Sequence, residues 1–206
     1  MRFLIFSLLL LFLSACSNAE MEKEQSATEP KPPAEPEAAV ASTTTSASPF
    51  ADSILKDERI GIVPVELEIP SIGVSAEVES VGLKENGEMD VTESFEKTGW
   101  YEKGYHPGEP GSAVIGGHVD SRDGPAVFYD LNKLALGDEI IVKGENGEEK
   151  VFVVTGKEEY PWNEAPLQKI FGYTHSSSLN LITCTGTFDR STRNYDKRLV
   201  VYTQLK

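Results

Sequence analysis

The sequence predicts an all-β fold, a barrel or a sandwich, for residues 59–206 of this 206-residue chain. Three observations predict it: short apolar runs recur at regular spacing, several of them alternate apolar and polar residues, and helical stretches are brief. Many short strands separated by turn signals are typical of both architectures. A domain of about 148 residues buries roughly 68–70% of its unfolded surface, so it needs no metal or disulfide to fold.

The expected strands differ in what predicts them. Val65–Ile69 and Val74–Val81 alternate, Ala113–Gly117 resembles a small buried strand, and Asn146-Gly147 predicts a hairpin turn. Brief helices are expected at Phe128–Leu134 and at Glu164–Phe171. The remaining strands are expected at Glu139–Val142, Lys150–Lys157, Leu179–Cys184 and Leu199–Leu205.

Residues 1–15 form an expected signal peptide rather than part of the fold. Arg2 provides a positive start, and the apolar run Phe3–Leu13 is too short to span a bilayer. The run ends in Leu13-Ser14-Ala15-Cys16, which resembles a lipobox and implies cleavage before Cys16 and lipidation of its thiol. The alternative is a plain secretory signal with an accidental cysteine. Both predict export, and an acyl chain would attach the protein to a membrane without a basic patch.

Residues 17–58 are expected to be a disordered tether. Prolines lie there among Glu, Ala, Ser and Thr, without apolar periodicity. Such a segment buries too little apolar surface to offset the entropy of ordering it. We therefore expect a spacer that lifts the folded domain off the membrane.

Charge and cysteine content exclude several classes of protein. Lys and Arg total 19 and Asp and Glu total 33, so the net charge is −14. This balance disfavours a nucleic-acid binder and a protein held to anionic lipid by charge. The two cysteines cannot form a disulfide scaffold or a four-thiolate zinc site. If Cys16 is lipidated, Cys184 is left as a lone thiol, either reactive or an inert core residue.

Three residues could carry chemistry. His118 follows the expected strand Ala113–Gly117, Cys184 ends the strand Leu179–Cys184, and Arg198 begins the last strand. Side chains at strand ends are accessible to substrates. A neighbouring His or Arg can activate a thiol, and a guanidinium can stabilise a developing oxyanion. From these residues alone, a structural role for the cysteine and the histidine stays open.

A longer pattern around these residues resembles the sortases, specifically their class F group. It comprises Pro107–Ser121, Gly124–Phe128, Leu136–Asp138 and the run Leu181–Cys184, followed by an arginine at Arg198. The resemblance covers about residues 60–206. It implies a closed eight-stranded sortase-type β-barrel with one or two short helices. It also implies transpeptidation of secreted proteins that carry a C-terminal sorting signal of the Leu-Pro-x-Thr-Gly type.

The same resemblance implies a role for each site residue. Cys184 would attack the Thr carbonyl and form a thioacyl enzyme. His118 would protonate the leaving Gly amine and then deprotonate the incoming amine. Arg198 would hold the substrate backbone and the oxyanion. Thr183 matches a position that assists substrate contacts, although a purely structural strand threonine is the alternative.

Some positions depart from the family pattern or compete with these assignments. Asn180 stands where the family often has Thr, a change expected to affect packing rather than chemistry. Arg190 and Arg193 also follow the cysteine, but in a polar stretch expected to be a loop. Asp120 could orient His118 or occupy a turn.

An acidic stretch could be interpreted as a calcium site, but we do not favour this interpretation. The residues concerned are Glu158, Glu159 and Glu164, which could be proposed as calcium ligands. A solvated acidic loop is the preferred interpretation, because calcium needs several convergent oxygens. No metal or cofactor is therefore expected.

Taken together, the predicted protein is a monomeric cysteine transpeptidase, lipid-anchored on the extracellular face of the bacterial cell membrane. Its expected partners are secreted proteins bearing an LPxTG-like signal and an amine acceptor from a peptidoglycan precursor, a cross-bridge or a pilin. Nucleic acid is not expected. The alternatives are a non-catalytic lipoprotein that binds the cell wall and an L,D-transpeptidase. The latter places its cysteine in a Ser-x-Gly-Cys-type motif, whereas Leu-Ile-Thr precedes Cys184.

Overall fold

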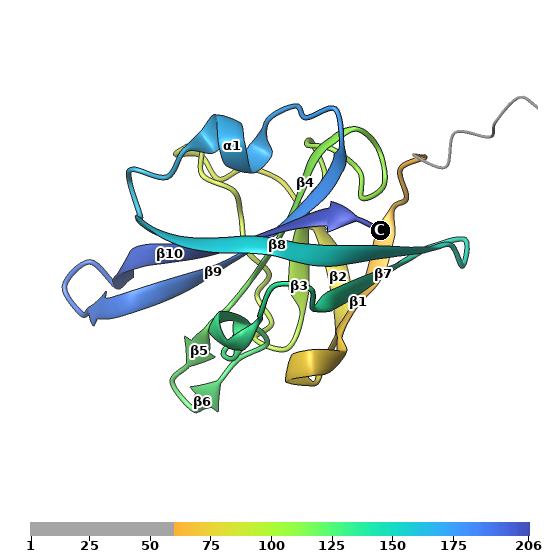
Figure 1. The fold of residues 1–206 in the computed structure, drawn as a ribbon. Helices are drawn as coiled ribbons and strands as arrows, with labels where there is room; N and C mark the ends of the chain where they lie inside the picture. The colour runs from red at the N-terminus through yellow and green to blue at the C-terminus, as the bar shows by residue number, and fades with distance from the viewer. Residues whose placement is uncertain (1–59) are drawn as a thin grey trace, which may run out of the picture. The chain divides into compact units, whose positions relative to one another are not determined.

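The computed structural model describes residues 60–206 (Figure 1). The signal peptide 1–15, Cys16 and the tether 17–58 lie outside the described residues, so those expectations stay predictions. The described chain is dominated by strands, as the sequence predicts.

Eight strands close into a barrel in the order β1-β2-β3-β4-β9-β10-β8-β7, which confirms the predicted fold class. Neighbours are antiparallel except for the parallel pairs β2–β3 and β4–β9. A separate two-stranded hairpin, β5–β6, follows β4 (Figure 1). The strands are β1 Pro64–Ile69, β2 Val74–Val81, β3 Thr98–Tyr101, β4 Gly111–Gly117, β5 Asp120–Ser121, β6 Gly124–Pro125, β7 Glu139–Gly144, β8 Glu149–Pro161, β9 Ser177–Asp189 and β10 Asn194–Leu205.

Strand β3 was absent from the sequence-based prediction. It is only four residues long, all but the last are buried, and they show no alternation that would reveal a strand. Its second residue, Gly99, leaves room for β2: a Cβ there would lie 2.9 Å from Cγ1 of Val81. The short strand nevertheless closes the barrel, since it pairs with β2 on one side and with β4 on the other.

The helical stretches are shorter than predicted. Phe128–Leu134 contains only a 3-10 turn at Leu131–Lys133, because Phe128, Leu131 and Leu134 are all fully buried at a spacing of three residues. That spacing matches the three-residue period of a 3-10 helix.

The helix expected over Glu164–Phe171 begins only at Leu167, as α1 Leu167–Phe171. Pro166 precedes it, and a residue before proline is disfavoured in helical geometry. A second 3-10 turn, Pro70–Ile72, joins β1 to β2.

The hairpin β9–β10 extends well beyond its predicted ends. The prediction stopped β9 at Cys184 and started β10 near Arg198, but β9 continues to Asp189 and β10 begins at Asn194. Most of the added residues are polar and exposed, and the apolar Phe188 among them is exposed too. They pair because the backbone hydrogen bonds of a ladder need no apolar side chains. A register shift between Tyr195 and Lys197 introduces a bulge into this extension.

Side chains alternate between two faces along β4, β9 and β10. We call the side toward the barrel interior the inner face and the opposite side the outer face. The inner face contributes Ala113, Ile115, Leu179, Leu181, Leu199 and Val201 to the main core. The outer face contributes Val114, Val200 and, partly buried, Ile182 to a second apolar cluster that includes Ile170 of α1.

Candidate active site

Strand register brings the histidine, the cysteine and the arginine together. In the parallel pair β4–β9, Gly116 lies opposite Ile182. His118 and Cys184 each follow two residues later, so they lie at the same level on neighbouring chain segments. In the antiparallel pair β9–β10, Arg198 lies directly opposite Cys184. Side chains at the same level of paired strands project to the same face.

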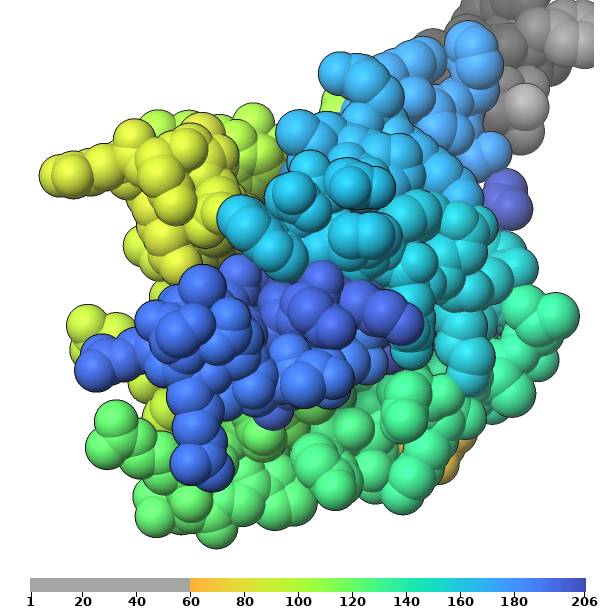
Figure 2. Space-filling view, turned by 90° about the vertical axis from the view of Figure 1, so that its left-hand side faces the viewer, coloured from red at the N-terminus to blue at the C-terminus, as the bar shows by residue number. Residues whose placement is uncertain are grey.

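These side chains project from the outer face of the barrel, not from its interior. Cys184 lies one residue beyond the inward-facing, buried Thr183, and strand alternation turns it outward. Cys184 and Arg198 therefore sit within strands rather than at strand ends, which corrects the prediction from sequence. Both side chains are partly exposed, and the paired strands continue past them into an exposed hairpin. Figure 2 shows this hairpin in blue, between the β2–β3 connection in yellow and the β5–β6 region in green.

Cys184 is a free, half-buried thiol. Burial raises the pKa of Cys184 above its ordinary value, the Arg198 charge opposes that rise, the Asp120 carboxylate adds to it, and Lys84 opposes it. The net direction is upward, so the resting side chain is mainly a neutral thiol at neutral pH. Forming the nucleophilic thiolate therefore requires a proton acceptor or additional positive charge.

His118 is held by both its ring and its backbone. Its Nε2 lies 2.9 Å from the carbonyl oxygen of Thr92, and the Phe95 ring packs against the imidazole at a centroid distance of 4.8 Å. The backbone N–H of Phe128 donates to the His118 carbonyl at 2.9 Å. The residue before the histidine must be glycine, because a Cβ on Gly117 would lie 2.6 Å from the Phe128 ring. The Phe128 ring thus occupies the space beside Gly117.

Arg198 directs its guanidinium toward its own hairpin. Nη1 donates to the carbonyl oxygens of Tyr195 and Lys197 at 3.2 and 3.0 Å, and Nη2 donates to Asn194 Oδ1 at 2.8 Å. The competing residues Arg190 and Arg193 are exposed and lie in the turn between β9 and β10. Only Arg198 among these three is paired with the cysteine.

Thr183 and Asn180 support the site from two sides of β9. The Thr183 hydroxyl faces inward and donates to the Gly117 carbonyl at 2.8 Å, which ties β9 to the segment that carries the histidine. Its expected contact with substrate stays a prediction. Asn180 faces outward, is buried, and its Nδ2 donates to the Ile170 carbonyl at 2.6 Å. The residue that departs from the family pattern therefore anchors α1.

Asp120 has a partner that sequence reasoning did not find. Its carboxylate accepts a hydrogen bond from the Tyr195 hydroxyl at 2.5 Å, which joins β5 to β10. This bond is the main reason why the pKa of Tyr195 is raised to about 12. Tyr195, Thr92 and Phe95 were not predicted site residues, because none lies in a motif and each acquires its partner from a distant part of the chain.

Two of the three acidic residues considered for calcium pair with lysines. Glu158 pairs with Lys169 at 2.6 Å, and Glu159 pairs with Lys197 at 3.2 Å. Within residues 60–206, no group of three or more His, Cys, Asp or Glu side chains is placed to hold a metal ion. None of the helices in this same part of the chain is long and apolar enough to cross a bilayer.

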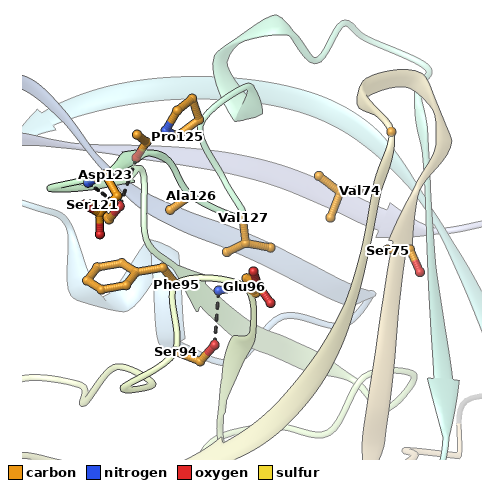
Figure 3. Close-up of a pocket in the computed structure, with 12 residues that line it drawn as sticks. Val74, Ser75, Ser94, Phe95, Glu96, Ser121, Asp123, Pro125, Ala126 and Val127 are labelled. Atoms are coloured by element: carbon orange, nitrogen blue, oxygen red, sulfur yellow. Dashed lines mark hydrogen bonds between the residues drawn. The ribbon is translucent and has the colours of Figure 1, made fainter.

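A hollow of about 840 Å³ lies near the histidine. It is bounded by the start of β2, the β2–β3 connection and the β5–β6 hairpin (Figure 3). Serine hydroxyls and the carboxylates of Glu96 and Asp123 make its lining largely polar. Phe95 belongs to this lining and also contacts the His118 ring, so one aromatic side chain adjoins both.

Comparison with known proteins shows the family of the chain. The family profile described as a sortase domain matches residues 67–206. The chain belongs to the sortase family. Members of this family are generally cysteine transpeptidases that act on LPxTG-type sorting substrates and amine acceptors. No curated protein matches the chain.

Solved sortases share the fold of this sortase domain at low sequence identity. A lid mutant of sortase A from Corynebacterium diphtheriae is 18% identical with a TM-score of 0.56, covering 71% of this chain and 72% of that one. Sortase C-1 from Actinomyces oris is 23% identical with a TM-score of 0.55, covering 69% and 74%. Sortase C1 from Streptococcus agalactiae is 22% identical with a TM-score of 0.55, covering 71% and 68%. These similarities support the barrel assignment.

Proposed function

We propose that this sortase is an exported transpeptidase of the class F type that uses Cys184, His118 and Arg198. It would cleave an LPxTG-like signal between Thr and Gly and transfer the protein to an amine. The observation that supports the proposal is the pairing of Cys184 with Arg198, together with the hydrogen bond from Thr183 to the carbonyl of Gly117, the residue before His118. A binding module would need none of this convergence.

In the first half of the proposed reaction, the Cys184 sulfur attacks the Thr carbonyl carbon and a C–S bond forms. The C–N bond to Gly then breaks, and the departing amine takes its proton from His118. Arg198 would turn from its hairpin carbonyls toward the substrate oxyanion, where a fixed positive charge stabilises the tetrahedral intermediate. Because the resting pKa of Cys184 is raised, the thiol proton must also be removed, and His118 is the neighbouring base.

In the second half, an amine attacks the thioacyl carbon and gives its proton to His118. The C–S bond breaks, and the sulfur leaves as the Cys184 thiolate, which recovers a proton. A water molecule in place of the amine would give hydrolysis as a side reaction. We propose a cross-bridge, peptidoglycan-precursor or pilin amine as the acceptor.

The decisive experiment uses the full chain and a quenched Leu-Pro-x-Thr-Gly peptide, with and without an amine acceptor. We expect cleavage and an amine-linked product from the wild type, and no turnover from Cys184→Ala with an unchanged fold. Arg198→Gln should also lose most of the activity, whereas Arg190→Gln should retain it because that arginine lies in the exposed hairpin turn. Turnover by Cys184→Ala near the wild-type rate would overturn the nucleophile assignment.

We also propose that lipidation of Cys16 anchors the protein on the extracellular face of the bacterial membrane. The lipobox-like run before Cys16 and the following polar, proline-containing segment support this attachment. Cys16→Ser should move the protein from the membrane to the soluble fraction, with Cys184→Ser as the matched control that stays bound. A Cys16→Ser protein that still fractionates with membranes would contradict lipid anchoring.

A further inference from the structure

The connection between β2 and β3 contacts the histidine at its ring. The Thr92 carbonyl oxygen lies 2.9 Å from His118 Nε2. A carbonyl oxygen has no proton, so it can only accept. The ring nitrogen must therefore donate, and Nε2 carries a proton in the neutral as well as in the charged imidazole. When one ring nitrogen is held in this way, the other one exchanges protons with the surroundings.

Thr92 is itself held firmly. The residue is only 5% exposed, and its single hydroxyl proton is shared between the Ser94 carbonyl at 2.9 Å and the Lys97 carbonyl at 3.3 Å. Lys97 in turn pairs with Glu77 and Glu79 of β2, at 3.0 and 2.7 Å. The segment of residues 92–97 is thus closed by side-chain bonds within itself and fastened to the barrel at its far end.

The same segment also touches the chain that follows the histidine. The Phe95 carbonyl accepts a hydrogen bond from the backbone N–H of Val127 at 2.9 Å, and the Phe95 ring packs on the imidazole. Figure 3 shows Phe95 and Val127 close to each other in the lining of the hollow. His118 therefore lies between two segments that are bonded to each other, and its ring has a defined place before substrate binds.

We propose that Thr92 is a positioning residue, whose carbonyl keeps the His118 proton on Nε2 and reserves Nδ1 for proton exchange with the thiol and the amines. The proposal rests on the proposed role of His118 as the acid and base of the transpeptidase. Thr92 acts through the imidazole and does not touch the reacting atoms. Its hydroxyl contributes indirectly, because it fixes the loop that presents the carbonyl.

The test compares Thr92→Val with Thr92→Ser in the full chain. Valine keeps the shape and removes the hydroxyl, whereas serine keeps the hydroxyl. We expect Thr92→Val to lower kcat by roughly 10-fold to 100-fold, because small displacements of a catalytic group cost this much. KM for the sorting peptide should change little. The pH dependence of kcat should also shift, and Thr92→Ser should restore both the rate and the pH profile.

The tautomer of His118, measured by NMR, tests this proposal independently of the proposed function. In protein labelled with ¹⁵N-histidine, the His118 signals are identified by their loss in His118→Gln. We expect neutral His118 of the wild type to carry its proton on Nε2, and Thr92→Val to populate the other tautomer as well. A wild-type proton on Nδ1 would overturn the proposal even in an active enzyme. An unchanged tautomer, kcat and pH profile in a folded Thr92→Val protein would overturn it too.

Discussion

The inner and outer faces of β4, β9 and β10 belong to the same strands but differ in burial and in the residues that they carry. On the inner face, Leu179 and Leu181 of β9 are fully buried in the main core. On the outer face of the same strand, Ile182 is only partly buried and Cys184 is half-buried. Beyond the second apolar cluster, the outer face carries Cys184 and Arg198.

This difference shows how one strand can support stability and reactivity at adjacent positions. Side chains alternate with a period of two, so the residue next to a core position points the other way. Thr183 contacts Gly117 on the inner face, and Cys184 faces Arg198 on the outer face. Substitutions on the two faces should therefore affect different measured quantities.

The largest effect is expected on kcat, when a residue of the outer face is substituted. His118→Ala should lower kcat by about 10²–10⁴-fold, because proton transfer then fails in both halves of the reaction. The midpoint of thermal unfolding should change little, since the ring is half-buried and outside the core. His175→Ala is the matched control, because that histidine is exposed in a loop. A near-normal kcat for His118→Ala would make this histidine structural.

The next largest effect is expected on the free energy of unfolding, when a residue of the inner face is substituted. Leu181→Ala should lower the free energy of unfolding by about 2–5 kcal/mol, because it leaves a cavity in a fully buried position. Ile182→Ala, one residue along on the outer face, should cost less because its side chain is only partly buried. Chemical denaturation of the two variants measures both losses. Equal losses would contradict the assignment of the two faces.

The smallest expected effect is on the pKa of Cys184, on the outer face. Asp120→Asn removes a charge that raises the pKa of Cys184, yet its amide oxygen can still accept the Tyr195 hydroxyl. The pKa of the thiol should fall, and at neutral pH a larger fraction becomes thiolate. Alkylation of Cys184 should then accelerate by roughly a few-fold, since rate follows thiolate fraction.

Asp123→Asn provides the control for this charge change. It removes the same charge from the neighbouring β5–β6 turn, where the residue does not contribute to the pKa of Cys184. Its alkylation rate should match the wild type. Slower alkylation of Asp120→Asn would contradict the inference that the Asp120 carboxylate raises the pKa of Cys184.

The sequence predicted most strands because their evidence is local. Alternation located β2 at Val74–Val81 with the same ends that the structure shows. β3 escaped prediction, since four residues with a glycine and no alternation provide too little local signal. The ends of β9 and β10 were also wrong, because polar residues such as Lys197 pair only when the facing strand is already in place.

Sequence patterns alone were enough to predict the alternating strands, the run Leu181–Cys184 and the family resemblance. The first two depend on residues within a few positions of one another, and the resemblance depends on the order of such short motifs along the chain. The folded structure was needed to show that Arg198 is paired with Cys184, that the Thr92 carbonyl contacts the His118 ring and that Asp120 binds Tyr195. These contacts join segments up to 75 residues apart. They form only when the barrel closes, because each barrel strand then pairs with a neighbour on both of its edges.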